Sequence, residues 1–563
     1  MSLNKSKSLK NFFNFHKPKS HLDLDQARRI GFWAALAISL GSVVGIGIFL
    51  ENSSVISALL NHDKTEVINS FSLWGLLATW ILAALISLLA AYSFSEIASS
   101  KQSKSGLAGW IDVLGGRKQG FFVKIMHSGM YYAIFCSCLT PIALEGLFKS
   151  IGDLQGVKIH YGWVILAGIL VFISITFLNF FALKISSKIQ IVGTITKLIP
   201  LILAIVVGLI GANSSHIVNN FDYNIPSDVN SKIPSTKFFD ITGVFTALPG
   251  ALFAFDSFLT IGNMAGDMKK PEKNVPLVAV LTIVIAAVVY ILIAIGAGLT
   301  GTGSVGDILK TLFPASNTEA RNAISITINI FITISAIFVV NAITMGMLKS
   351  CEGLISSNEV MFFSFFQKLN KKWDNFGSLL LFLIENFFYI LLLGIPAAVM
   401  NNDAILDSAT NAPTLIFFFI YAYTMILGIK DRIEIRKKKA TNPNSNNLIG
   451  KCPNRVKGYV FTATIASILI LVVFFYVFFY KNIYLTSLDP NNNSSSGLFF
   501  TDGVKWTLMY DAILFWVLLI WSVALPTINY FVVKKQTSKD SENRDLFIPF
   551  NWKEKFHKNK KLI

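Results

Sequence analysis

An aspartate lies inside an apolar stretch where a charge is costly. The stretch reads Leu248-Pro249-Gly250-Ala251-Leu252-Phe253-Ala254-Phe255-Asp256-Ser257-Phe258. An ionisable residue in such surroundings is a candidate functional residue. The Pro-Gly pair before it disfavours a continuous helix, because proline removes a backbone donor and glycine is flexible. The combination predicts an interrupted helix with a carboxylate at the interruption, able to bind an amine or to cap the unwound backbone.

A second run is rich in glycine and reads Gly41-Ser42-Val43-Val44-Gly45-Ile46-Gly47-Ile48-Phe49. Three glycines within seven residues each cost a helix roughly 1 kcal/mol relative to alanine. They permit positive φ angles and close approach of another backbone. The spacing alone leaves two interpretations open, namely a broken helix and close packing of small residues against a neighbouring helix.

One lysine also lies inside an apolar run, Thr194-Ile195-Thr196-Lys197-Leu198-Ile199-Pro200. Its amino group either reaches the membrane surface near Lys188 or turns inward toward the first glycine-rich run. Burial disfavours the charged ammonium, so an inward lysine can release and rebind a proton. Glu145, Glu385 and Asp511 also fall in or near apolar runs, and we expect Glu145 and Asp511 to contact solvent near helix ends.

The elements that hold these residues are membrane helices, as the composition indicates. Of 563 residues, 53% are hydrophobic and 14% are charged, against roughly 25% charged in soluble domains. Too few charges are present to cover soluble surfaces, which excludes a cytosolic enzyme. About twelve runs are long enough to span a bilayer as helices. They begin near Gly31, Leu73, Phe121, Gly162, Val192, Ile241, Leu277, Ile324, Gly377, Pro413, Tyr459 and Thr507.

The net charge of +17 is a topology signal. Of the 49 Lys and Arg residues, 39 lie in alternate loops and the two tails. The positive-inside rule therefore predicts that both termini are cytoplasmic, and we expect contact with the lipid bilayer and no nucleic-acid partner. The four cysteines show no zinc-ligand spacing, and we expect no metal and no cofactor.

The two interrupted runs fall on the first and sixth helices, as a repeat of five helices in each half requires. An odd number of helices in each repeat inverts the second half in the membrane. We expect the following organisation: a cytoplasmic N-terminal tail (1–28), a first five-helix repeat (29–211), a second, inverted repeat (239–428), a basic cytoplasmic linker (429–457), helices 11 and 12 (458–533) and a cytoplasmic C-terminal tail (534–563).

These motifs resemble those of the amino acid–polyamine–organocation permeases. The first-helix run and Phe253-Ala254-Phe255-Asp256-Ser257-Phe258 are similar to the family's two signatures, and Asp267-Met268-Lys269-Lys270-Pro271 is similar to the loop that follows. Tyr92-Ser93-Phe94-Ser95-Glu96-Ile97 resembles the end of its second helix. Ser257 stands where the family usually has glycine. The resemblance implies an all-α polytopic membrane protein with a five-plus-five inverted-repeat (LeuT-like) core, broken helices 1 and 6, and two added C-terminal helices.

The resemblance also implies a substrate site. It places a substrate carboxylate against the backbone N–H groups of Ile46 and Gly47, and the ammonium against the carbonyls of Val43, Phe253 and Asp256. Phe253 corresponds to an aromatic gate, and proton-coupled members carry a lysine at the position of Lys197. The candidate substrate-binding residues are Ser42, Val43, Gly45, Ile46, Gly47, Phe253, Ala254, Phe255 and Asp256, and the candidate proton-coupling residue is Lys197.

The sequence thus predicts a non-enzymatic, multi-pass permease of the plasma membrane that imports an amino acid by alternating access, coupled to protons. A polyamine or organocation carrier and an amino acid exchanger are the alternatives within transport. A substrate-sensing receptor would usually carry a large soluble output region, whereas the tail here has about 30 residues. The sequence names neither the amino acid nor any oligomeric partner.

Overall fold

The computed structural model describes residues 30–59, 70–100, 106–210, 222–224, 241–265, 268–300, 304–314, 316–441, 457–492, 500 and 506–537. The expected N-terminal tail (1–28), residues 442–456 of the expected linker, residues 538–563 of the expected C-terminal tail, and Asp267 lie outside the described residues.

Helices make up almost all of the described chain. Its first half contains α3 (Phe32–Val43), α4 (Ile46–Leu59), α5 (Leu73–Ser100), α6 (Gly106–Gly115), α7 (Arg117–Met126), the π-helix η1 (His127–Tyr132), α8 (Ala133–Gln155), α9 (Tyr161–Phe181) and α10 (Leu183–Ile210). The next part contains α11 (Ile241–Phe255), α12 (Thr260–Asn263), α13 (Pro271–Thr300), α14 (Val305–Lys310), α15 (Thr318–Ser356) and α16 (Phe363–Lys372). The last part contains α17 (Phe376–Tyr389), η3 (Ile390–Gly394), α18 (Ile395–Met400), α19 (Ala404–Thr441), α20 (Tyr459–Phe475), η5 (Tyr476–Leu485), α21 (Thr486–Leu488) and α22 (Leu508–Thr537).

Eleven helical segments in the described part are long and apolar enough to cross a membrane. The first apolar run is not among them, because two residues divide it into α3 and α4, each too short to qualify. Large apolar side chains on the outside of the bundle, such as Val192 and Ile195 on α10, are well exposed. In water such a surface would aggregate, whereas lipid suits it. The expectation of an all-α polytopic membrane protein is confirmed.

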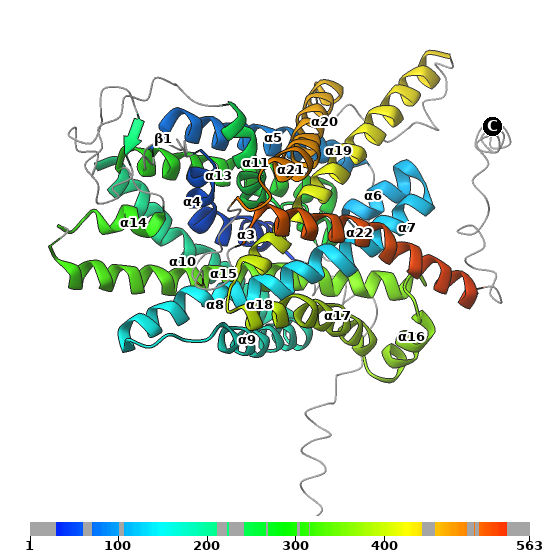
Figure 1. Cartoon of the computed structure of the whole chain (residues 1–563). Coiled ribbons are helices and arrows are strands. Elements are labelled where there is room, and N and C mark those ends of the chain that lie inside the picture. Colours follow the sequence, from blue (N-terminus) through cyan, green and yellow to red (C-terminus); the bar gives the residue numbers. More distant parts are fainter. Residues whose placement is uncertain are drawn as a thin grey trace, which may run out of the picture.

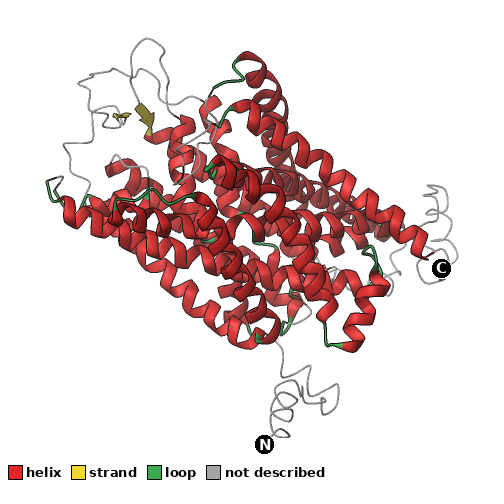
Figure 2. Cartoon of the chain, turned by 60° about the horizontal axis from the view of Figure 1, so that its bottom comes forward, coloured by secondary structure: helices red, strands yellow, loops and turns green. Residues whose placement is uncertain are grey.

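The helices form one bundle with two distinguishable ends (Figure 1). At one end lie α6, α7 and α16, which belong to the Lys- and Arg-rich loops, and we call this the basic end. At the opposite end lie α14 and a small ribbon, in which β1 (Ser70–Ser72) pairs antiparallel with β2 (Asp222–Asn224). Figure 2 shows the ribbon beside the helix ends and outside the helical core.

The core is formed where the two interrupted helices are enclosed by longer ones. Helix α10 packs on α3, α11 packs on α4, and α13 packs on both α3 and α5. Helix α15 packs on α8 and on α3. The interruptions are therefore buried in the middle of the bundle, surrounded by helices from both halves of the chain.

Candidate functional site

The first helix is interrupted between Val43 and Ile46. Helix α3 ends at Val43, Val44 adopts an extended conformation (φ −78°, ψ 103°), and α4 begins at Ile46. The glycines around this break allow close contacts. An added Cβ would lie 2.0 Å from a Val339 side-chain carbon at Gly45 and 2.7 Å from the Ala254 Cα at Gly47. Both glycines therefore permit an approach that no other residue allows.

Gly41 has a different role, because it lies within α3 and faces α10. An added Cβ there would lie 2.0 Å from the Gln190 side-chain nitrogen. Thr194 on α10 also donates a hydrogen bond to the Ala37 carbonyl of α3, at 2.9 Å. Both interpretations of the glycine-rich run thus apply, since Gly45 lies at the break while Gly41 and Gly47 allow close packing against α10 and α11.

The sixth helix is interrupted just after Phe255. Helix α11 ends there, the chain turns through residues 256–259, and α12 resumes at Thr260. Ser257 has φ +66°, in the left-handed region that favours glycine. The structure therefore gives a physical reason why a glycine suits this position, and a serine here costs about 1–2 kcal/mol of backbone strain.

The two breaks contact each other. The Ser42 hydroxyl lies within hydrogen-bonding distance of the Ser39 carbonyl (2.8 Å) and of the Ser257 carbonyl (3.3 Å). From α13, the Tyr290 hydroxyl lies 3.0 Å from the Val43 carbonyl and 3.1 Å from that of Ala254. The candidate residues of the first and sixth helices are thus brought together, although they lie more than 200 positions apart in the chain.

Asp256 is held by two tyrosines from other helices. Its side chain accepts hydrogen bonds from the hydroxyls of Tyr131 on η1 (2.7 Å) and Tyr421 on α19 (3.0 Å). The residue is 2% exposed, and among the described residues it makes no ion pair. Its backbone N–H donates to the Phe253 carbonyl at 3.1 Å. The carboxylate is therefore fixed in position by neutral donors, and its negative charge is not compensated by a described cation.

Aromatic rings form one wall of this region. Phe253 stacks on Phe135 of α8 with ring centroids 5.9 Å apart. Tyr131 packs against Phe135 (4.6 Å) and against Phe417 of α19 (4.4 Å). Such rings exclude water from the surroundings of Asp256 and strengthen electrostatic interactions there.

Lys197 turns toward the first helix and not toward the surface. The side chain is buried, and its amino group donates a hydrogen bond of 2.8 Å to the Gly41 carbonyl. Gly41 lies two residues before the end of α3. The ammonium is thus next to the interrupted helix, on the side of it that faces α10.

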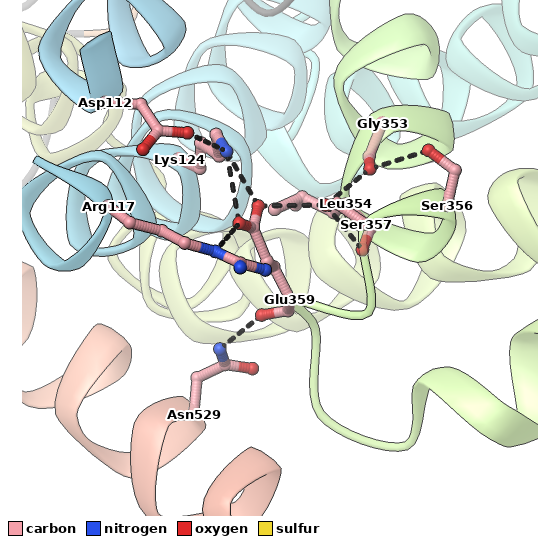
Figure 3. Close-up of polar contacts among 9 residues, drawn as sticks. All are labelled: Asp112, Arg117, Lys124, Gly353, Leu354, Ser356, Ser357, Glu359 and Asn529. Atoms are coloured by element: carbon pink, nitrogen blue, oxygen red, sulfur yellow. Dashed lines mark hydrogen bonds and ion pairs between the residues drawn. The ribbon is translucent and has the colours of Figure 1, made fainter. Parts of the chain in front are cut away.

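A partly buried network of ion pairs and hydrogen bonds ties four elements together at the basic end (Figure 3). The Lys124 amino group lies 2.9 Å from the Glu359 carboxylate, just beyond α15, and 3.0 Å from that of Asp112 on α6. Asn529 on α22 donates to the Glu359 carbonyl at 2.8 Å. Glu359 is almost completely buried, so solvent screens its ion pair with Lys124 far less than it screens a surface ion pair.

A second ion pair lies at the same end. Arg432 on α19 pairs with Glu96 near the end of α5, and both side chains are buried. The guanidinium also lies over the Tyr459 ring of α20, 5.7 Å from its centroid. Together with the Lys124 network, this pair links helices of the two halves of the chain at the basic end.

Residues 30–518 match the model of a protein family described as amino acid permease. The chain belongs to the amino acid permease family. Its members are transporters and not enzymes. The eleven apolar helical segments and the family together indicate that this permease is a multi-pass membrane protein.

Two of the curated relatives that the chain matches are bacterial exchangers or antiporters. The serine/threonine exchanger SteT of Bacillus subtilis (strain 168) is 25% identical over 271 residues, which cover 47% of the permease and 53% of that protein. The cadaverine/lysine antiporter of Escherichia coli (strain K12) is 22% identical over 303 residues, which cover 53% of the permease and 58% of that protein. The permease thus spans about half to three-fifths of the length of these relatives.

Among solved structures, the manganese transporter of Eremococcus coleocola superposes with a TM-score of 0.53 over 93% of the permease and 98% of that chain. The sequences are 12% identical. At this identity the likeness shows that the two proteins share a fold, and nothing more.

Sequence reasoning missed the tyrosines around the breaks and one buried acid. Nothing in the local sequence distinguishes Tyr131, Tyr290 and Tyr421 from the other tyrosines. Glu51, by contrast, could have been found from the sequence, since it is an ionisable residue only two positions after the glycine-rich run. The expectation that Glu145 contacts solvent is wrong, because its side chain is buried against Tyr161, whose hydroxyl donates to it.

Proposed function

We propose that this permease is a secondary active transporter that imports an amino acid across the plasma membrane by alternating access. The observation that carries the proposal is the meeting of the two helix breaks beside Asp256. At the start of α4 the N–H groups of Ile46 and Gly47 lack helical partners, and the positive end of the helix dipole favours a carboxylate there. Asp256 favours an ammonium. A free amino acid carries both groups on one carbon.

The carbonyls at the breaks support the same assignment. The Val43 carbonyl accepts from Tyr290, and the Phe253 carbonyl accepts from the Asp256 N–H. Each carbonyl oxygen has a second lone pair, so both can still accept from a substrate ammonium. Phe253, stacked on Phe135, is placed to cover the substrate from one side.

The ion networks at the basic end support alternating access. Ion pairs join α6, α7 and the end of α15, and a hydrogen bond from Asn529 adds α22. A second ion pair joins α5 to α19. We assign this end to the cytoplasm from the distribution of Lys and Arg. Release of substrate to the cytoplasm then requires these contacts to separate, while the opposite end closes.

Lys197 is proposed to couple transport to protons. Its amino group contacts α3 just before the break, so loss of its proton replaces a charge-assisted hydrogen bond to the first helix with a weaker neutral one. The difference is about 1–1.5 kcal/mol, enough to shift a two-state equilibrium about 10-fold. The protonation state of Lys197 can therefore bias the position of the first helix.

Flux measurements in proteoliposomes test the proposal. We expect saturable uptake that is independent of sodium and stimulated by an inward proton gradient. Lys197→Ala should still bind substrate but should lose gradient-driven accumulation. Lys188→Ala is the matched control, because Lys188 is on the same helix and exposed. Uptake that requires sodium, or accumulation by Lys197→Ala in response to a pH gradient, contradicts the coupling role.

Exchange is the second candidate function. It is favoured by the names of two relatives, one a serine/threonine exchanger and the other a cadaverine/lysine antiporter. Preloading the vesicles with unlabelled substrate distinguishes the two modes. Uptake that occurs only into preloaded vesicles indicates obligatory exchange, whereas equal uptake into empty vesicles indicates net import.

A further inference from the structure

Glu385 is the only charged residue in the membrane-spanning segment Phe376–Met400. It lies on α17, nine residues after Phe376, which corresponds to about 13–14 Å along a helix. The hydrocarbon core of a bilayer is about 30 Å thick, so this carboxyl group lies well away from both membrane surfaces. The transport cycle proposed above does not use it.

Neutral groups surround the Glu385 carboxyl group. Its Oε2 atom lies 3.1 Å from the Ser128 hydroxyl of η1 and 3.6 Å from the Cys351 thiol of α15. On the other side, a Cβ added at Gly129 would lie 3.4 Å from Oε1 and 3.1 Å from a methyl carbon of Leu525. No ion pair reaches Glu385 from the described residues. A negative charge at this position is therefore not compensated by any described group.

The cations on the helices around α17 have other partners or lie near helix ends. Helix α17 packs on α8, α15, α16 and η3. On α15, Lys349 is bonded to Glu352 at 3.1 Å, and on α8, Lys149 is paired with Asp153 at 3.5 Å. The other cations on these helices and on α22 are Arg321 on α15, Lys368, Lys371 and Lys372 on α16, and Lys534 and Lys535 on α22.

The titratable groups beside Glu385 are a thiol and a phenol, which are neutral in water at pH 7. They belong to Cys351 and to Tyr389, one turn further along α17. On η1, the His127 ring stacks on the rings of Tyr132 and Phe417, with centroids 4.4 and 5.0 Å apart. The buried acid on α8, Glu145, accepts from Tyr161.

Glu385 is connected to the proposed substrate site through η1. Ser128, which donates to Glu385, lies three residues before Tyr131, whose hydroxyl donates to the carboxylate at the sixth-helix break. From the next turn of α17, Tyr389 donates to the Gly129 carbonyl at 2.8 Å. Helix α17 thus holds η1 at two adjacent residues, and a movement of α17 relative to η1 would displace Tyr131.

We propose that Glu385 carries a proton inside the membrane and that this proton keeps α17 and η1 together. An ionised carboxylate would have two neutral donors at Oε2 and no described donor at Oε1, which is strongly unfavourable away from water. Loss of the proton would therefore draw water between α17 and η1 and separate them. Glu385 is then a positioning residue for Tyr131, because it acts through η1.

A carbodiimide tests for the proton, because it reacts with protonated carboxyl groups. Dicyclohexylcarbodiimide takes the carboxyl proton on one nitrogen, while the carboxylate oxygen bonds to its central carbon. The acyl group then leaves this oxygen and bonds to the second nitrogen. The stable N-acylurea contains every atom of both reactants, so the reaction needs no further reagent.

Glu385 is also within reach of a reagent dissolved in lipid. Helix α17 lies at the edge of the bundle (Figure 1), and its residues Ile384 and Phe388 are 52% and 45% exposed. Glu385 itself is partly exposed, whereas Asp256 is 2% exposed in the middle of the bundle. A lipid-soluble carbodiimide should therefore label Glu385 in preference to Asp256.

Peptide mass spectrometry of the full-length protein in lipid nanodiscs measures this labelling. We expect one dicyclohexylcarbodiimide adduct on Glu385, in an amount that falls as the pH is raised from about 6 to about 9. A charged, water-soluble carbodiimide should not label Glu385. The matched control is Glu352→Gln, which removes a partly exposed acid on α15 and should leave the labelling of Glu385 unchanged.

Hydrogen exchange tests the link to η1. Glu385→Gln keeps the size of the side chain and an oxygen acceptor but has no proton to lose. At about pH 6, the amides of His127–Tyr132 should exchange equally in this variant and in the wild-type protein. At about pH 9, they should exchange at least about 3-fold faster in the wild-type protein. Comparison at the same pH cancels the intrinsic pH dependence of exchange, and Glu352→Gln should behave as the wild-type protein.

Three results would overturn the inference. Absence of an adduct on Glu385 at every pH shows that it carries no proton. Labelling that stays constant between about pH 6 and 9 shows that the proton does not leave, and equal exchange in the wild-type protein and Glu385→Gln at about pH 9 shows that η1 does not depend on it. If Glu385→Gln fails to fold, the wild-type protein decides, because its labelling and the protection of its η1 amides must fall over the same pH range.

Neither measurement uses a substrate. Failure of this inference would therefore leave the proposed transport function intact, and absence of transport would leave the inference intact.

Discussion

Replacing Gly47 by alanine tests the contact on which the substrate site depends. The added Cβ would lie 2.7 Å from the Ala254 Cα and 2.8 Å from the Ala254 Cβ, whereas ordinary carbon–carbon contacts are about 3.5–4.0 Å. Helices α4 and α11 must therefore separate by about 1 Å. Overpacking of this kind costs about 1–3 kcal/mol. A shift of this size also moves the N–H groups of α4 out of hydrogen-bonding distance of a carboxylate.

We expect Gly47→Ala to lower uptake of labelled substrate at least 10-fold in proteoliposomes and to lower the midpoint of thermal unfolding in detergent. Gly31→Ala is the matched control, because a Cβ at Gly31 would meet nothing within 4 Å. The double variant Gly47→Ala/Ala254→Gly should not recover normal uptake. The atom nearest to the added Cβ is the backbone Cα of residue 254, which the second substitution leaves in place. Normal uptake by Gly47→Ala, or full recovery in the double variant, would refute the close approach of the two helices.

Two other predictions concern backbone strain and buried charge. Ser257→Gly should be more stable than Ser257→Ala by about 1 kcal/mol in denaturant unfolding, because both lose the hydroxyl and only glycine relieves the left-handed backbone; equal stabilities would contradict the strain. Lys124→Met should destabilise the protein by about 3 kcal/mol, because it removes the nearest cation from buried Glu359. The double variant Lys124→Met/Glu359→Met should recover part of this loss, and a purely additive loss would show that the two groups do not interact.

Much of the fold could be predicted from the sequence, because membrane helices are long apolar runs. The expected starts at Leu73, Ile241 and Tyr459 coincide with those of α5, α11 and α20. Other starts were placed too late, since polar turns can be helical without being apolar. Helix α10 begins at Leu183 and not near Val192, and α19 begins at Ala404 and not near Pro413, which lies inside the helix.

The candidate site was predictable only where backbone chemistry leaves a local signal. The glycines of the first helix and the Pro-Gly pair before Asp256 are such signals, because they record backbone requirements. The partners of Asp256 are not, since Tyr131 and Tyr421 come from positions 125 and 165 residues away. Which tyrosine reaches a given carboxylate depends on helix packing, and tyrosines are common in membrane helices for other reasons.

The π-helix η1 has a consequence for insertions and deletions in this chain. It contains Tyr131 and leaves the Gly129 carbonyl to accept from the Tyr389 hydroxyl at 2.8 Å. A π-helical turn holds one residue more than an α-helical turn. Deleting one residue from His127–Tyr132 would therefore close this turn into an α-helical one, with the helix on either side kept in place. The residues inside the turn would change direction, which breaks the hydrogen bond from Tyr131 to Asp256. Across these six positions, the number of residues is as much a requirement of the site as their identities.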